Sequence, residues 1–109
     1  MSLSTHVLDT ATGLPAAGMT VTLFTAQDVP VESGTTDADG RYRFVAELEP
    51  GTYRLRFNTG AYLADTGTPS LYPYVDVTFL VTGERGGAGG HLHVPLLLSP
   101  FGYSTYQGS

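Results

Sequence analysis

The sequence predicts an all-β fold in which two sheets pack face to face as a sandwich of about eight strands. Two observations carry this prediction. Apolar and polar residues alternate with a period of two along most of the chain, as in strands that have one buried face. Segments rich in glycine, proline and aspartate separate the alternating runs, and the chain has 14 glycines and 7 prolines. Its 109 residues suit a single domain, 1–109.

Hydrophobic alternation places the strands in chain order. We expect them at 3–10, 19–25, 30–36, 41–48, 52–58, 73–82, 90–98 and 102–107. The inward residues recur at every second position, for example Val21 and Leu23, then Tyr53, Leu55 and Phe57, then Val75, Val77, Phe79 and Val81. Turn signals separate these runs at 12–15, 37–40 and 49–51.

Three segments depart from simple alternation. Residues 59–67 lack the β-branched runs of a strand and predict at most one short helix, with Thr59 as its cap. The glycine cluster at 86–90 predicts a flexible hairpin loop, because the residues after it are strand-like and no helix follows to bind a phosphate. The strand at 90–98 is apolar on both faces toward its end, so we expect both faces to be covered.

Charge and composition limit the partners. Ten acidic residues against five arginines give a net charge of −5, and the arginines form no basic stripe, so we expect neither nucleic acid nor a membrane as partner. No apolar run reaches the ~18 residues of a membrane helix. The N-terminus lacks the pattern of a secretory signal, which predicts a cytoplasmic protein, or a periplasmic one if a signal was removed. The absence of cysteine excludes a disulfide framework and a cysteine nucleophile.

Three histidines are the candidates for chemistry: His6, His91 and His93. His91 and His93 share one face of a strand because they are two residues apart. The opposite face carries the apolar set Leu92, Val94, Leu96 and Leu98, which we assign to the core. The histidines therefore point outward, and so does His6, on a face that also carries Leu8, Pro95 and Leu97. Ordinary solvated strand histidines are the alternative, but a face this apolar predicts cover by another subunit.

Several motifs along the chain resemble one family. They are HVLD at 6–9, GLPA at 13–16, DGR at 39–41, HLHVPLLLSP at 91–100 and YSTY at 103–106. Together they resemble the 5-hydroxyisourate hydrolases, the transthyretin-related enzymes of purine catabolism, over essentially the whole chain. The resemblance implies a prealbumin-like (transthyretin-like) sandwich and a homotetramer, a dimer of dimers with active sites at the dimer–dimer interface.

The same resemblance implies a reaction without metal or other cofactor, the hydrolysis of 5-hydroxyisourate to 2-oxo-4-hydroxy-4-carboxy-5-ureidoimidazoline in urate degradation. The implied catalytic residues are His6, Arg41, His93 and Ser109. The implied substrate-binding residues are His6, Arg41, Tyr106 and Gly108. Histidines would deprotonate water and then protonate the leaving nitrogen, and the guanidinium would hold substrate oxygens. The sequence leaves open which histidine is the base.

The C-terminal tail departs from the family pattern at one position. The family usually ends Tyr-Arg-Gly-Ser, and this chain has Gln107 in place of that arginine. On an extended tail Gln107 points away from the side that Tyr106 occupies, so we expect it outside the pocket.

Two alternatives remain at this stage. A non-catalytic prealbumin-like binding or structural module accounts for the first half of the chain but not for the HLHVPLLLSP segment or the Tyr106 tail, and a hormone carrier of this fold lacks the paired histidines. A zinc site formed by His6, His91 and His93 has suitable spacing but no obvious carboxylate to orient its ligands.

Overall fold

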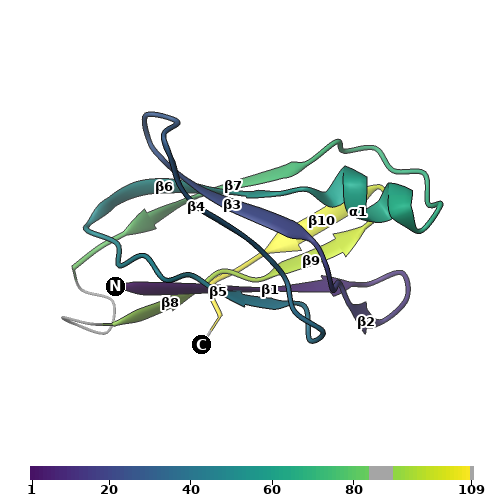
Figure 1. Ribbon diagram of the computed structural model, residues 1–109, viewed down its shortest axis with the longest axis horizontal. Coiled ribbons are helices and arrows are strands. Elements are labelled where there is room, and N and C mark those ends of the chain that lie inside the picture. The colour runs from purple at the N-terminus through teal and green to yellow at the C-terminus, as the bar shows by residue number, and fades with distance from the viewer. Residues whose placement is uncertain (84–89, 109) are drawn as a thin grey trace.

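The computed structural model describes residues 1–83 and 90–108. Most of the hairpin loop predicted at 86–90 therefore lies outside the described residues, as does Ser109. Within the described ranges the chain forms ten strands and one short helix, and the strands make two sheets (Figure 1). This confirms the two-sheet, all-β architecture that the alternation predicts. No helix in these ranges is long and apolar enough to span a bilayer.

The first sheet is built around its N-terminal strand. Its strands are β1 (Ser2–Asp9), β2 (Leu14–Pro15), β5 (Arg41–Arg43), β8 (His91–His93), β9 (Leu96–Ser99) and β10 (Gly102–Thr105). Along one edge β1 pairs in parallel with β8 and then with β9, and along the other it pairs antiparallel with β5 and β2. β10 continues the sheet beyond β9 as an antiparallel neighbour. Within this sheet, all strands except β10 therefore pair directly with β1.

The second sheet is a simpler antiparallel one. Its order is β4 (Pro30–Thr35), β3 (Thr20–Thr25), β6 (Gly51–Phe57) and β7 (Val75–Val81). The helix α1 (Thr59–Asp65) connects β6 to β7 and lies at one end of the sandwich (Figure 1). This sheet covers the inner face of the first one.

Both sheets contribute their alternating apolar residues to one core. The first sheet supplies Leu3, Val7, Leu92, Val94, Leu96 and Leu98. The second supplies Val21, Leu23, Leu55, Phe57, Val75, Val77 and Val81. The inward side of 90–98 is therefore the one that the sequence predicts. Because the side-chain period of a strand is two, burial of these residues turns their neighbours to the outer faces.

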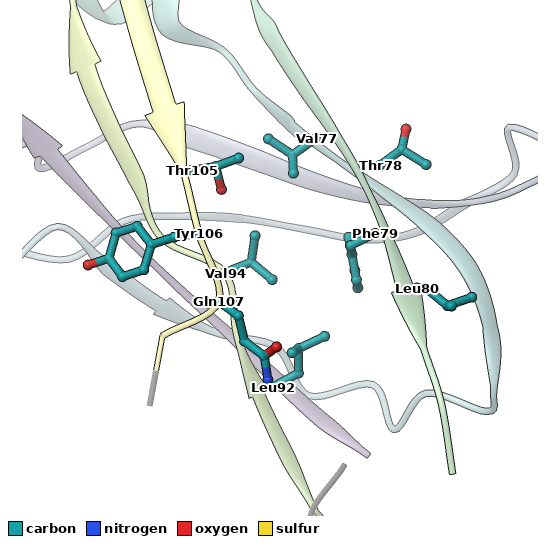
Figure 2. Close-up of a pocket in the computed structure, with 9 residues that line it drawn as sticks. All are labelled: Val77, Thr78, Phe79, Leu80, Leu92, Val94, Thr105, Tyr106 and Gln107. Carbon is teal, nitrogen blue, oxygen red and sulfur yellow. The ribbon is translucent and has the colours of Figure 1, made fainter. Parts of the chain in front are cut away.

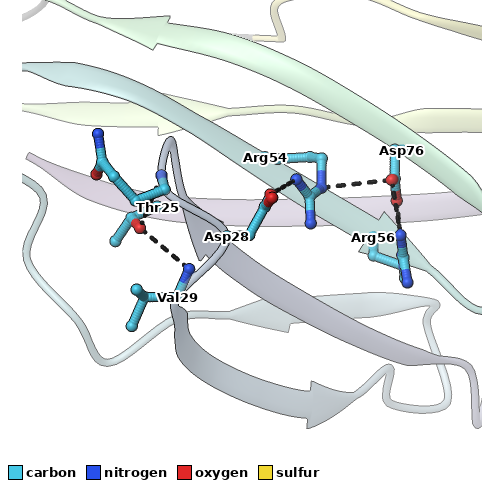
Figure 3. A network of polar contacts seen from close by, with 7 residues as sticks. Thr25, Asp28, Val29, Arg54, Arg56 and Asp76 are labelled. Atoms are coloured by element: carbon cyan, nitrogen blue, oxygen red, sulfur yellow. Dashed lines mark hydrogen bonds and ion pairs between the residues drawn. The ribbon is translucent and has the colours of Figure 1, made fainter.

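The outer face of the second sheet carries an ion-pair network (Figure 3). Arg56 donates to both carboxylate oxygens of Asp76 on the next strand, at 2.9 and 3.0 Å. Arg54 lies between Asp28 and Asp76, and its guanidinium stands 4.6 Å from the centre of the Phe24 ring. An arginine whose guanidinium is bound by carboxylates of its own sheet is not available to bind another anion. Two of the five arginines are therefore structural.

The predicted strand at 41–48 is too long. Only its first three residues form β5, because the Glu32 carboxylate accepts hydrogen bonds from the backbone N–H groups of Val45 and Ala46 at 2.9–3.0 Å. A side chain has replaced a neighbouring strand as their partner. Burial is the largest single contribution to the pKa of Glu32 and raises it. The hydrogen bonds lower it, and the net result is a pKa below the ordinary value.

The predicted strand at 90–98 divides into β8 and β9. Proline lacks the N–H that a ladder needs, and the break falls at Val94 and Pro95. Pro95 is buried, so this position is covered. The Thr105 hydroxyl donates to the Pro95 carbonyl at 2.7 Å, so the C-terminal segment lies against this position.

Two smaller expectations are also wrong. The predicted turn at 12–15 contains the short strand β2, which pairs with Leu8 and Asp9. Thr59 is not the helix cap but the first residue of α1, where it is buried, and Asn58 holds the cap position without a side-chain hydrogen bond. The other six strands begin and end within two residues of the predicted bounds.

We expect the turn before β5 to tolerate no side chain at Gly40. Gly40 has φ +74°, and a Cβ there would lie 2.5 Å from the Val7 carbonyl oxygen, whereas Gly13, with φ +76°, has no atom within 4 Å of such a Cβ. Gly13→Ala should cost about 1–2 kcal/mol for the left-handed backbone alone. Gly40→Ala should cost a further 1–3 kcal/mol or so, by analogy with overpacking. Urea unfolding measures both, and equal losses would contradict the clash.

Candidate active site

The turn at 37–40 sets Arg41 opposite His6. The Asp37 carboxylate accepts hydrogen bonds from the backbone N–H groups of Asp39 and Arg41, at 2.9 and 3.0 Å. Gly40 closes the turn through its N–H to the Asp37 carbonyl and accepts from the Val7 N–H at 2.8 Å. The strand that follows then pairs His6 with Arg41. Paired residues on neighbouring strands share a face, so both side chains lie on the outer face of the first sheet.

The parallel pairing of β1 with β8 brings His93 to the same face. His93 pairs with Ser4, which also pairs with Arg43 on the other side of β1. Ser4 and His6 are two residues apart and share a face. His93, 52 residues beyond Arg41 in the chain, thus joins Arg41 and His6 on one surface. The sequence-predicted trio is brought together.

The environment of His93 lowers the pKa of its imidazole. Partial burial has the largest effect, and the electrostatic effects of Arg41, His6 and His91 lower the pKa further, while a backbone hydrogen bond with Ser4 acts in the opposite direction. Among the described residues, the Arg41 guanidinium makes no ion pair. An imidazole with a lowered pKa beside a guanidinium without an ion-pair partner suits a base next to an anion-binding group.

Arg41 and His93 line a hollow of about 290 Å³ on this face. Its other lining residues are Ser4, Thr5, Asp37, Tyr42 and Arg43. Small-molecule sites typically begin at about this volume. His6 does not line the hollow itself but lies on the same face beside Arg41.

The C-terminal tail returns to His93. The Gly108 N–H donates to the His93 carbonyl at 2.9 Å, and the two residues form an isolated antiparallel bridge. A Cβ at position 108 would lie 2.5 Å from His93 Cδ2, so only glycine fits. Gly108 is therefore in place beside the site, whereas the predicted catalytic Ser109 lies outside the described residues.

Tyr106 and Gln107 project in different directions (Figure 2). The Gln107 side chain extends toward Leu92, along an apolar groove of about 260 Å³ that residues 77–80 of β7 and residues 105–107 of the tail line. That groove is separate from the hollow at His93. Gln107 therefore lies outside the hollow, as expected for an extended tail, but Tyr106 lines the same groove and does not line the hollow either. Tyr106 is 56% exposed and contacts neither histidine through a hydrogen bond within the described part of the chain.

Sequence reasoning missed two serines. The Ser4 hydroxyl lies 2.7 Å from His93 Nδ1 and 2.7 Å from His91 Nε2, and the Ser2 hydroxyl lies 2.6 Å from His91 Nδ1. The signal was present, because Ser2, Ser4 and His6 recur at every second position of one strand. The sequence did not reveal that this strand pairs with the strand that carries His91 and His93.

The same contacts bear on the zinc alternative. Both ring nitrogens of His91 already face serine hydroxyls at 2.6–2.7 Å. Across residues 1–83 and 90–108, no group of three or more His, Cys, Asp or Glu side chains is arranged to hold a metal ion. The geometry of the histidines therefore does not favour a shared metal.

Known proteins resemble this chain over its whole length. The 5-hydroxyisourate hydrolase of Mus musculus is 44% identical, over 98% of this chain and 94% of that protein. The structure of the Klebsiella pneumoniae 5-hydroxyisourate hydrolase matches with a TM-score of 0.89 and 39% identity, covering 100% of both chains. Sea bream transthyretin in complex with thyroxine matches with a TM-score of 0.85 and 30% identity, over 97% of this chain and 93% of that one.

Fold, histidines and tail together define a transthyretin-like sandwich that carries a histidine–arginine site on the outer face of one sheet. The model of the HIUase/Transthyretin family matches residues 3–108. The chain belongs to this family. The transthyretin-like fold expected from the motifs is thereby confirmed.

We expect His93 to titrate below the ordinary pKa of histidine, about 6.5. The unfolded chain then binds a proton at His93 before the folded chain does, so this contribution to stability is complete above pH ~6.5 and is lost as the pH falls toward the lowered folded value. NMR titration of the histidine ring signals measures this pKa. A folded-state pKa of His93 above that of a histidine peptide would contradict the expected direction.

Proposed function

We propose that this chain is a hydrolase that converts 5-hydroxyisourate to 2-oxo-4-hydroxy-4-carboxy-5-ureidoimidazoline in urate degradation. The observation that carries the proposal is the joint placement of His6, Arg41 and His93 on one face, where Arg41 and His93 line a hollow of about 290 Å³. The mouse and Klebsiella relatives, both named 5-hydroxyisourate hydrolase, support the substrate. Opening a cyclic amide requires an activated water and a donor for the oxyanion, and histidine and arginine supply both.

The proposed roles follow from the surroundings of each side chain. His93, whose pKa burial and Arg41 lower, takes a proton from the attacking water. Arg41 holds the substrate oxygens, where its fixed fork of donors stabilises the charge that develops in the tetrahedral intermediate. His6, beside Arg41 on β1, orients the water and shares the proton transfers. The leaving ring nitrogen then receives the proton.

The tail completes the proposed pocket. The Gly108 N–H donates to the His93 carbonyl at 2.9 Å, which brings residue 108 close to the site. We assign substrate contacts to Tyr106 and Gly108, and a catalytic contribution to Ser109 through its hydroxyl or, if it ends the chain, its carboxylate. Tyr106, 56% exposed in one protomer, is then available to the substrate or to a neighbouring subunit.

We further propose that the protein is a homotetramer, a dimer of dimers with the sites at the dimer–dimer interface. Leu8 and Leu97 stand as partners on the outer face that carries the histidines, and each is only partly buried in the protomer. Half-buried leucines on the face that carries His6 and His93 favour cover by a second copy of the chain.

Purified protein should accelerate the loss of freshly generated 5-hydroxyisourate, followed by its ultraviolet absorbance. A rate equal to spontaneous decay would refute the hydrolase and favour the non-catalytic binding module. Activity that a chelator abolishes would instead favour a metal enzyme.

We expect His6→Ala and His93→Ala each to lower kcat by about 10²-fold or more, because groups that transfer protons typically contribute 10²–10⁴-fold. His91→Ala should lower it less, because both nitrogens of His91 face serines rather than the hollow. Circular dichroism and sedimentation control for folding and assembly. Equal losses in all three variants would contradict this division of roles.

Leu97→Glu should separate the dimers while preserving each protomer, because it puts a charge on the outer face and leaves the core residues untouched. Sedimentation should show dimers, circular dichroism a native fold, and the assay little activity. Leu71→Glu is the matched control, since Leu71 is 63% exposed and lies outside the histidine face. A dimeric Leu97→Glu protein with full activity would contradict a site shared between dimers.

A further inference from the structure

A chain of hydrogen bonds leads from His93 away from the hollow. His93 Nδ1 lies 2.7 Å from the Ser4 hydroxyl, which lies 2.7 Å from His91 Nε2. His91 Nδ1 lies 2.6 Å from the Ser2 hydroxyl, which reaches the Gly90 carbonyl at 3.4 Å. His93 is partly buried and His91 is exposed. These hydrogen bonds therefore connect the proposed base, His93, to a second imidazole that is nearer to solvent.

The number of hydrogen atoms available to these serines and histidines restricts which group donates in each hydrogen bond. A serine hydroxyl has one hydrogen, so Ser4 donates to one imidazole and accepts from the other. If Ser4 donates to His91 Nε2, it accepts from His93 Nδ1–H, and neutral His91 keeps a hydrogen on Nδ1 for Ser2. Ser2 can then donate to the Gly90 carbonyl. In the reverse arrangement Ser2 gives its hydrogen to His91, and the bond to the carbonyl is lost.

We propose that Ser4 and His91 hold His93 as its Nδ1-protonated tautomer, so that Nε2 is the base for water, and that Ser4 carries the proton onward to His91. This inference rests on the proposed function, because it names the base atom of that reaction. Ser4 also lines the hollow, and the role proposed for it is that of a positioning and relay residue that acts through His93.

The proton transfers balance. Water gives a proton to His93 Nε2 as its oxygen bonds the ring carbonyl carbon, His93 Nδ1 gives its proton to Ser4, and Ser4 gives its own to His91 Nε2. His91 is then the cation, and His93 is neutral with a hydrogen on Nε2. When the C–N bond breaks, that hydrogen passes to the leaving nitrogen. The protons on Ser4 and His91 return by the same path, which restores the starting state.

Electrostatics favour the cation on His91. His93 faces Arg41 from β5, His6 from β1 and His91 from its own strand, all of which lower its pKa, and Arg43 and Asp37 line the same hollow. In the strand register His93 pairs with Ser4, whereas His91 pairs with Ser2, two residues farther from the row of His6 and Arg41. A positive charge on His91 is therefore farther from Arg41 and better solvated.

The first test is independent of activity. In protein with ¹⁵N-labelled histidine at a pH above the pKa of His93, the ring nitrogen shifts should show the hydrogen of His93 on Nδ1. In Ser4→Ala, His93 should shift toward the Nε2-protonated form that free histidine prefers. An Nε2-protonated His93 in the unaltered protein would overturn the inference, even if the protein hydrolyses 5-hydroxyisourate.

The second test is kinetic. Ser4→Ala should lower kcat about tenfold with KM little changed, equivalent to about 1.4 kcal/mol. Ser4→Thr keeps the hydroxyl and should restore most of the rate. Ser33→Ala, which removes a comparable hydroxyl pair with Thr22 on the other sheet, should leave kcat unchanged. Equal losses for Ser4→Ala and Ser4→Thr would overturn the relay. An Nδ1-protonated His93 in a protein without activity would refute the proposed function and leave the tautomer assignment standing.

Discussion

The pairing of β1 on both of its edges is the constraint on which the rest of the structure depends. β1 pairs antiparallel with β5 and β2 along one edge and in parallel with β8 and β9 along the other. Leu3, Thr5 and Val7 are fully buried in the sandwich, and this turns Ser4 and His6 outward. A slip of one residue would exchange the two faces of the strand and expose the core set. Core packing therefore holds the register that sets His6 opposite Arg41 and Ser4 opposite His93.

The electrostatic character of the site follows from a difference between the arginines of the two sheets. The arginines of the second sheet are paired with aspartates and lie near aromatic rings, so they are engaged within their own sheet. The Arg41 guanidinium, within the described residues, has no such carboxylate partner, and its charge acts on His93. An unpaired cation costs little at a surface and remains free to meet an anionic oxygen. Stability and chemistry are thus divided between the sheets.

Local patterns were sufficient for most of the fold. Period-two alternation identified the buried residues of both sheets, because burial of one strand face requires that pattern whatever the partner strands are. It failed beyond β5, where the Glu32 carboxylate accepts the backbone hydrogen bonds that a strand would have made. It failed again at Pro95, which lacks a backbone donor. It also missed the two-residue strand β2, which is too short to show a period.

The sequence by itself determined the fold class, the outward direction of the histidines and, through the motifs, the grouping of His6, Arg41 and His93. Only the tertiary structure decided the hydrogen bonds that Ser4 makes to His91 and His93, which join residues 87 and 89 positions apart. It also decided the return of Gly108 to the His93 backbone. The physical reason is that alternation specifies which way a side chain points, whereas its neighbours depend on strand register, which ladder bonds and core packing set between distant segments.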